Sequence, residues 1–233
     1  MSALVLFDFD GTLADTAPDL AAAANRQRER RGLPALPEPQ LRPYASQGAR
    51  GLLRAALDLT PEHPEFPAAR QQFLDDYEAA MTRHTRLFPG IAELLARLGR
   101  HGLAWGIVTN KVERLARPLV SHLGLDGDCA ALVCGDTTAH SKPHPEPLLH
   151  AARLAGYAAS ASLYVGDDLR DVQAARAAGM PVIAAGYGYC GGDEASAWQA
   201  DRCVADPAAL WPAIAGLLRA GGLCPELSGA ASD

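Results

Sequence analysis

The sequence has little that would suit a disulfide-stabilised or nucleic-acid-binding protein. Its 5 cysteines are an odd number and widely scattered, without a Cys-x-x-Cys pair or a histidine partner at zinc spacing. This argues against a disulfide framework or a zinc finger and favours free thiols in a reducing compartment. The formal net charge of -6 argues against the basic surface that generic nucleic-acid binding needs, so an anionic substrate would have to be held by local positive charge.

The first residues also lack the features of a targeting or membrane segment. They carry no basic leader, and the apolar stretch Leu4–Phe7 meets an acid at Asp8. We therefore expect neither a signal peptide nor a membrane span, and a cytoplasmic protein without membrane or nucleic-acid partners. The sequence leaves the oligomeric state open.

What the sequence does have is an alternation of short apolar runs and helical patterns. Apolar runs of strand length lie at 4–7, 103–108, 131–134, 163–165 and 182–185. Between two of them, apolar residues from Val112 to Leu123 recur at helical spacing and stop at Gly124, where a left-handed helix end is expected. The alternation predicts an α/β fold with a Rossmann-like parallel sheet covered by helices.

Residues 15–83 break the alternation, because they contain helical patterns and no convincing strand. A capping threonine, a proline and an acid at 16–19 indicate a helix start, and large apolar residues recur at helical spacing over 73–81. We therefore expect a helical cap domain, inserted after the first strand. The predicted division is an α/β core at 1–14 and 84–220, the cap at 15–83 and a flexible tail at 221–233.

Four polar motifs stand at predicted strand ends or helix starts. They are FDFDGT at 7–12, VTN at 108–110, SKP at 141–143 and VGDDLRD at 165–171. Because the carboxyl ends of parallel strands meet at one edge of the sheet, we expect the motifs to converge there. Asp8 and Asp10 alone could be the solvent face of an edge strand, but the other three motifs weaken that interpretation.

The ordered motifs resemble those of the haloacid dehalogenase superfamily of phosphatases over nearly the whole chain. The resemblance implies that Asp8 attacks phosphorus to form an aspartyl-phosphate, and that Asp10 protonates the leaving group and then activates water. It makes Lys142 the cation that holds the nucleophile and the phosphate together. It also implies a Mg²⁺ ion bound by Asp8, the backbone carbonyl of Asp10, and Asp167.

The same resemblance gives supporting roles to further residues. Thr109 and the backbone of Asn110 would bind the phosphate, and Gly11 lets the backbone approach this anion closely. Asp171 would orient Lys142 or a metal-bound water. Asp168 stands where related sequences often have serine or threonine, so its role is left open between a part in the site and its periphery.

Selection of the substrate is expected to depend on the cap. Arg50, in the segment SQGARG at 46–51, could contact a substrate carboxylate or be an exposed arginine at a helix start. Within the superfamily the chain most resembles phosphoglycolate phosphatases, through DGTLADTAPDL at 10–20 and YVGDDLRDVQAARAAG at 164–179. It is also similar to N-acetylmuramic acid 6-phosphate phosphatases, through the cap segment, WGIVTNK at 105–111 and YGY at 187–189. The resemblance implies Mg²⁺-dependent hydrolysis of a small phosphorylated metabolite, with 2-phosphoglycolate first and the amino-sugar phosphate as the alternative.

Other classes remain as alternatives. A dehalogenase would not need the acid at Asp10 or Mg²⁺, a sugar phosphomutase would return the phosphate to a sugar, and a binding module on a degenerate core would be expected to have lost a motif acid. The segment Gly186–Gly192 lacks the spacing of a dinucleotide fingerprint and is predicted to be a mobile loop beside the site.

Overall fold

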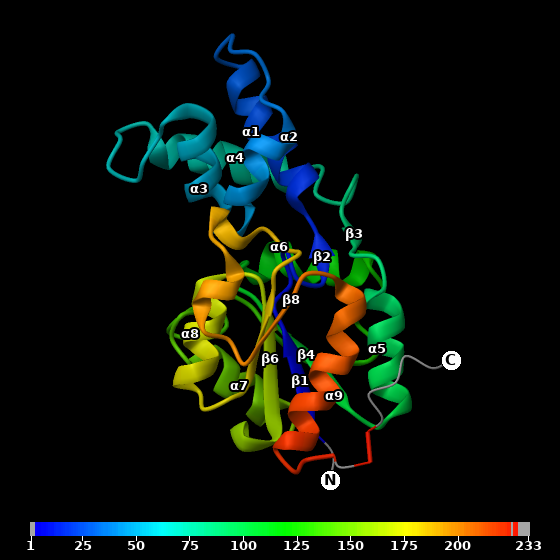
Figure 1. Cartoon of the computed structure of the whole chain (residues 1–233). Helices are drawn as coiled ribbons and strands as arrows, with labels where there is room; N and C mark the ends of the chain where they lie inside the picture. Colours follow the sequence, from blue (N-terminus) through cyan, green and yellow to red (C-terminus); the bar gives the residue numbers. More distant parts are fainter. Residues whose placement is uncertain (1–2, 225, 228–233) are drawn as a thin grey trace.

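The computed structural model describes residues 3–224, 226 and 227 and is built around a six-stranded sheet (Figure 1). The strand order is β5-β4-β1-β6-β7-β8, and every neighbouring pair is parallel. The strands are β1 (Leu4–Phe7), β4 (Ala104–Val108), β5 (Cys129–Val133), β6 (Ser162–Gly166), β7 (Val182–Ala185) and β8 (Arg202–Val204). The predicted α/β class with a parallel sheet is confirmed.

Helices cover both faces of this sheet, which explains why its central strands are continuous apolar runs. Val5 and Phe7 of β1 point into one buried cluster with α5 (Ile91–Arg100), α6 (Glu113–His122) and α9 (Leu210–Ala220). Leu4 and Leu6 point the opposite way, into a cluster with α7 (Glu146–Leu154) and α8 (Leu169–Ala177). Figure 1 shows α7 and α8 on one side of the sheet and α5 and α9 on the other.

A layer of helices is inserted between β1 and β4 and stands over one end of the sheet (Figure 1). It contains α1 (Ala17–Glu29), α2 (Glu38–Leu41), the 3-10 helix η1 (Arg42–Gln47), α3 (Gly48–Leu57) and α4 (Phe66–Glu78). The chain passes into and out of it through β2 (Ala14–Asp15) and β3 (Arg86–Leu87), which pair antiparallel. The inserted helical cap is therefore present, and two adjacent short strands join it to the core.

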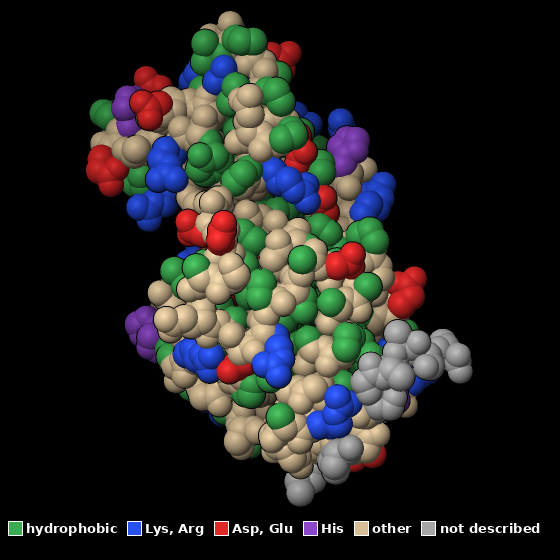
Figure 2. All heavy atoms as spheres, viewed as in Figure 1, with side chains coloured by type: hydrophobic (Ala, Val, Ile, Leu, Met, Phe, Trp, Pro, Cys, Tyr) green, Lys and Arg blue, Asp and Glu red, His purple; other side chains and the backbone are tan. Residues whose placement is uncertain are grey.

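Basic and acidic side chains are interspersed on the face drawn in Figure 2, and the outline of the molecule narrows where the cap meets the core. Short 3-10 helices lie in the connecting loops: η2 (Ala159–Ala161), η3 (Cys190–Gly192), η4 (Ala195–Trp198) and η5 (Pro207–Ala209). Within the described residues, which include all 5 cysteines, no disulfide is formed. Within the described residues, no helix is both long and apolar enough to cross a membrane.

The structure adds elements that the sequence patterns did not indicate. The edge strand β8 has two exposed residues and one buried residue, so it does not form an apolar run. After α9 the chain turns at Gly221 and Gly222, and Cys224 and Leu227 are buried against the core. These residues fall in the segment predicted to be a flexible tail; residues 225 and 228–233 of that segment lie outside the described residues.

Candidate active site

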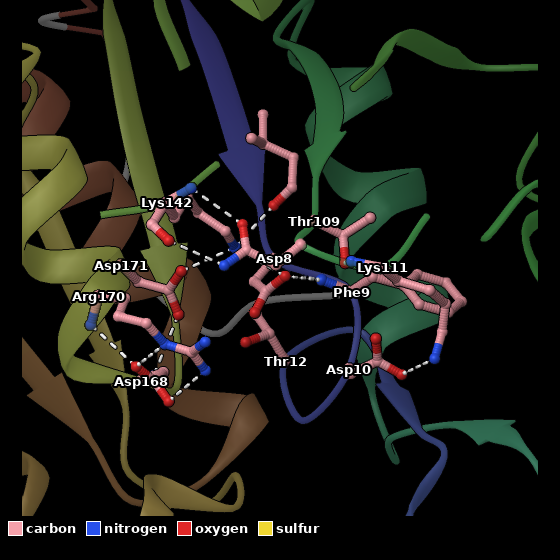
Figure 3. Close-up of polar contacts among 12 residues, drawn as sticks. Asp8, Phe9, Asp10, Thr12, Thr109, Lys111, Lys142, Asp168, Arg170 and Asp171 are labelled. Atoms are coloured by element: carbon pink, nitrogen blue, oxygen red, sulfur yellow. Dashed lines mark hydrogen bonds and ion pairs between the residues drawn. The ribbon is translucent and has the colours of Figure 1, made fainter. Parts of the chain in front are cut away.

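The four predicted motifs meet at the carboxyl ends of the central strands (Figure 3), at the end of the sheet over which the cap stands (Figure 1). Asp8 directly follows β1, Thr109 follows β4, and Asp167 follows β6, while Lys142 lies in the loop before α7; all four side chains are buried. A cavity of about 360 Å³ lies against this edge. The motif residues that line it, together with Arg50 of the cap, are Asp8, Asp10, Thr109, Asn110, Ser141, Lys142, Asp168, Arg170 and Asp171.

Lys142 is the centre of a buried polar network. Its Nζ lies 2.9 Å from Asp8 Oδ1 and 2.8 Å from Asp171 Oδ1, and it also donates to Tyr164 Oη at 2.8 Å. The Asn110 side chain holds the Lys142 backbone by two reciprocal hydrogen bonds of 2.9 Å. The structure thus places Asn110 as a support for the lysine that contacts both acids.

Three buried carboxylates, those of Asp8, Asp167 and Asp171, have oxygen atoms within 4.8 Å of one another. Burial raises the pKa of Asp8 to about 7, although Lys142 acts in the opposite direction. Burial and the nearby charges of Asp8 and Asp171 also raise the pKa of Asp167. Burial thus disfavours the ionised form of both acids, and the hard oxygen donors of the three carboxylates suit Mg²⁺, whose charge would favour that form. The residues present fit the predicted metal.

Asp167 is fixed by donors from several parts of the chain. Its Oδ1 accepts from Thr12 Oγ1 at 3.1 Å, and its Oδ2 accepts from the Tyr189 N–H at 2.8 Å and from Ser46 Oγ of the cap at 3.2 Å. Gly11 has φ 82°, and a Cβ there would lie 2.2 Å from Asp167 Oδ2. The structure therefore shows what Gly11 does: it makes room for this carboxylate.

The side chain of Asp10 turns away from the carboxylate cluster (Figure 3). Its Oδ1 accepts from Thr16 Oγ1 and lies 2.9 Å from Lys111 Nζ. Lys111 also contacts Tyr77 of α4, with Nζ 3.3 Å from the hydroxyl. Burial acts to lower the pKa of Lys111, but the contacts with Asp10 and Tyr77 together raise it. The carboxyl predicted to transfer protons is thus held between the core and the cap.

Sequence reasoning overlooked Lys111, although a signal was available. The chain has 21 lysines and arginines together, but only Lys111 and Lys142 are lysines. Lysine supplies a compact charge on a flexible stem, whereas arginine supplies a planar fork. Both lysines are paired with motif aspartates, at 2.9 Å from Asp10 and Asp8 respectively.

Asp168 has a structural role at the start of α8. It caps the helix by accepting from the Arg170 N–H, while Asp171 Oδ2 accepts from the Asp168 N–H. The Arg170 guanidinium binds both oxygens of Asp168, at 2.8 Å each, and donates to Ser46 O of the cap at 2.8 Å. Although burial acts in the opposite direction, Arg170 lowers the pKa of Asp168. Asp168 therefore places an arginine that reaches the cap.

Two arginines of the cap line the cavity, Arg50 at the start of α3 and Arg70 in α4. Both are exposed, and neither forms an ion pair with an acid in the part of the chain that the structure describes. Apolar side chains, including Phe73, Leu74 and Leu115, line the same cavity. The cap side of the cavity thus combines positive charge with apolar surface.

Comparisons with known proteins agree on one family. Residues 5–185 match the family model described as haloacid dehalogenase-like hydrolase. A phosphoglycolate phosphatase of Xanthomonas campestris pv. campestris (strain 8004) is 48% identical over 211 residues, covering 89% of this chain and 94% of that protein. An N-acetylmuramic acid 6-phosphate phosphatase of Pseudomonas aeruginosa is 44% identical over 207 residues, covering 88% of this chain and 92% of that protein. A crystal structure described as a predicted phosphoglycolate phosphatase from Haemophilus somnus 129PT aligns with a TM-score of 0.80 at 29% identity. The alignment covers 90% of this chain and 96% of that one.

Proposed function

The chain belongs to the haloacid dehalogenase-like hydrolases, and we propose that it hydrolyses a small phosphate monoester through an aspartyl-phosphate on Asp8. The observation that carries this proposal is the position of Asp8 in the cavity beneath the cap, 2.9 Å from Lys142, with Asp10 lining the same cavity. The close relatives named as phosphatases of small metabolites support the same reaction.

Asp8 is arranged to act as a nucleophile. Its Oδ1 accepts from the Phe9 N–H at 2.7 Å and pairs with Lys142, so the second oxygen can form the bond to phosphorus. As that bond forms, the ester P–O bond breaks and Asp10 gives its proton to the leaving oxygen. Asp10 then takes a proton from water, whose oxygen attacks phosphorus, and the Asp8–phosphorus bond breaks to release phosphate. Asp8, the backbone carbonyl of Asp10, and Asp167 would hold Mg²⁺, which offsets repulsion between the acids and the phosphate.

We propose 2-phosphoglycolate as the first candidate substrate, on the similarity to phosphoglycolate phosphatases over most of the chain. N-acetylmuramic acid 6-phosphate is the second candidate substrate, and the size of the cavity supports it. In phosphoglycolate the carboxylate carbon lies within about 4 Å of phosphorus, by ordinary bond lengths. A cavity of about 360 Å³ with two arginines and an apolar wall has room for a much larger carboxylated leaving group.

Turnover of a substrate panel tests the proposed function. The panel contains 2-phosphoglycolate, N-acetylmuramic acid 6-phosphate and hexose phosphates, each assayed for free phosphate with Mg²⁺ and after chelation. We expect Mg²⁺-dependent release, with one of the two carboxylated substrates at least about 10-fold ahead of the hexose phosphates, because a charged contact contributes more than about 1.4 kcal/mol. Isomerised sugar phosphate without free phosphate would instead identify a phosphomutase, and release that chelation does not affect would remove the metal from the proposal.

Replacing the cap arginines separates the two substrates. Arg50→Ala and Arg70→Ala are each expected to lower kcat/KM for N-acetylmuramic acid 6-phosphate by about 10-fold or more, because each removes a charge-assisted contact with its carboxylate. Turnover of 2-phosphoglycolate should change much less, since its carboxylate stays near the phosphate. Arg83→Ala is the matched control, as Arg83 is exposed and is not among the residues that line the cavity. Equal losses of kcat/KM on both substrates would contradict a role of these arginines in substrate discrimination.

A further inference from the structure

The segment Gly186–Gly192, predicted to be a mobile loop, is held between the core and the cap. Tyr189 is only 4% exposed, and η3 at the end of the segment packs against η1 of the cap. In Figure 1 this gold segment lies between the sheet and the underside of the cap. Tyr187 Oη donates to Thr12 O in the core at 2.8 Å. Tyr187 is therefore hydrogen-bonded to the core, whereas the end of the segment that follows Tyr189 contacts the cap.

The Tyr189 hydroxyl oxygen accepts two hydrogen bonds from the backbone at the start of α1. The backbone N–H groups of Thr16 and Ala17 donate to it at 2.7 and 2.9 Å, and the hydroxyl donates to Asp15 Oδ1 at 3.0 Å. First-turn N–H groups have no partner inside their own helix, and Thr16 directs its own hydroxyl to Asp10. A phenol can accept two hydrogen bonds and donate one. Tyr189 therefore uses its full bonding capacity where the chain passes into the cap.

The backbone of the same residue holds the carboxylate of Asp167. The Tyr189 N–H donates to Asp167 Oδ2 at 2.8 Å. A Cβ on Gly188 would lie 2.3 Å from Asp167 Cβ and 2.4 Å from Gly11 O, so the loop runs directly against this aspartate. Ser46 Oγ of η1 donates to the same Oδ2 at 3.2 Å. The orientation of Asp167 thus depends on this loop and on the cap together.

We propose that Tyr189 is a positioning residue that couples docking of the cap to the orientation of Asp167, and through it to the affinity of the site for Mg²⁺. The inference rests on the proposed metal site. The side chain of Tyr189 binds the first turn of α1, and its peptide group binds Asp167, so a shift of α1 away from the core moves or frees the donor that orients the carboxylate. Arg42 strengthens the same junction, since its guanidinium lies 5.1 Å from the Tyr189 ring centroid and 3.0 Å from Asp15.

Removal of the hydroxyl by Tyr189→Phe tests the coupling, with Tyr187→Phe as the matched control. Both variants lose one phenol oxygen from the same loop, but only the first loses contacts with α1. Mg²⁺ affinity is measured by calorimetry on the full chain without substrate, and amide hydrogen exchange is followed in the first turn of α1. We expect Tyr189→Phe to bind Mg²⁺ roughly 10-fold more weakly, as for partners that orient ligand carboxylates. Its amides at Thr16 and Ala17 should exchange faster, because they lose their acceptor. Tyr187→Phe should keep both properties close to those of the wild type.

Each other outcome has a definite meaning. If the wild type binds Mg²⁺ and Tyr189→Phe binds it equally well, the coupling is wrong and the proposed metal site stands. An equal loss in Tyr187→Phe also overturns the coupling, because the effect would not depend on contact with the cap. A wild type that binds no Mg²⁺ overturns the metal site and the coupling together. If Tyr189→Phe does not fold, Arg42→Ala loosens the same junction by removing the ion pair with Asp15 and the contact with the Tyr189 ring, and unchanged Mg²⁺ affinity in that variant overturns the coupling.

Discussion

Asp8→Asn is expected to abolish turnover, with a loss in kcat on the order of 10⁴-fold or more, because an amide oxygen cannot form the phosphoenzyme. The fold should survive the change. Asparagine retains an oxygen at the position that accepts from the Phe9 N–H and faces Lys142. Burial already raises the pKa of Asp8 to about 7, so removing this charge should cost the folded state little. Phosphate release from 2-phosphoglycolate and thermal unfolding in a chelator measure the two effects.

Two companion variants make this result specific. Asp10→Asn should slow both formation and hydrolysis of the phosphoenzyme, by roughly 10²- to 10⁴-fold, the usual range for loss of a general acid or base. Asp126→Asn, an exposed acid outside the cavity, serves as the control for loss of one negative charge. Radiolabelled substrate should leave acid-stable label on the wild type and none on Asp8→Asn. An Asp8→Asn protein with a near-normal rate would refute the assignment of the nucleophile.

The parallel sheet could be predicted from the sequence because its inner strands are buried on both faces. β1 and β7 have the bounds that their apolar runs predict, 4–7 and 182–185. β8 could not be found in this way, since Arg202 and Cys203 are exposed at the edge of the sheet. A scan for apolar runs detects burial rather than pairing, so it detects inner strands and passes over a short edge strand.

The core of the candidate site could be predicted for a related reason. A motif at the end of a parallel strand has its place in the fold set by topology, so Asp8, Thr109 and Asp167 follow from the order of the strands. Contacts between the core and the cap could not be predicted, because they join segments far apart in the sequence. Gly188 is an example of such a contact. A glycine in the sequence suggests a flexible loop, but in the structure Gly188 allows the backbone to lie close to Asp167.

Lys142→Met is expected to give the largest loss of stability, because it leaves Asp8 and Asp171 buried without their shared cation. Both carboxylates lie within 2.9 Å of the Lys142 Nζ. Removing one partner of a buried ion pair typically costs about 3–5 kcal/mol. Activity should fall by roughly 10³-fold as well, because the cation that would face the phosphate is lost. Chemical denaturation in the absence of metal measures the free energy of unfolding, and Lys142→Arg, which keeps the charge, should recover part of it.

The pH dependence of that loss identifies its cause. In the wild type Lys142 acts to lower the pKa of Asp8, which is nevertheless about 7, so in Lys142→Met the folded-state pKa should be higher still. A carboxyl whose pKa is higher in the folded state than in the unfolded state binds more protons when folded. Its contribution to stability is therefore greatest at low pH and is lost as the pH rises through the folded-state pKa. The stability difference between Lys142→Met and the wild type should accordingly change little below about pH 6 and widen as the pH rises through about 7, where the wild-type carboxyl ionises and that of the variant is still protonated. A difference that stays constant over this range would mean that lost packing, rather than two unpaired carboxylates, destabilises the variant.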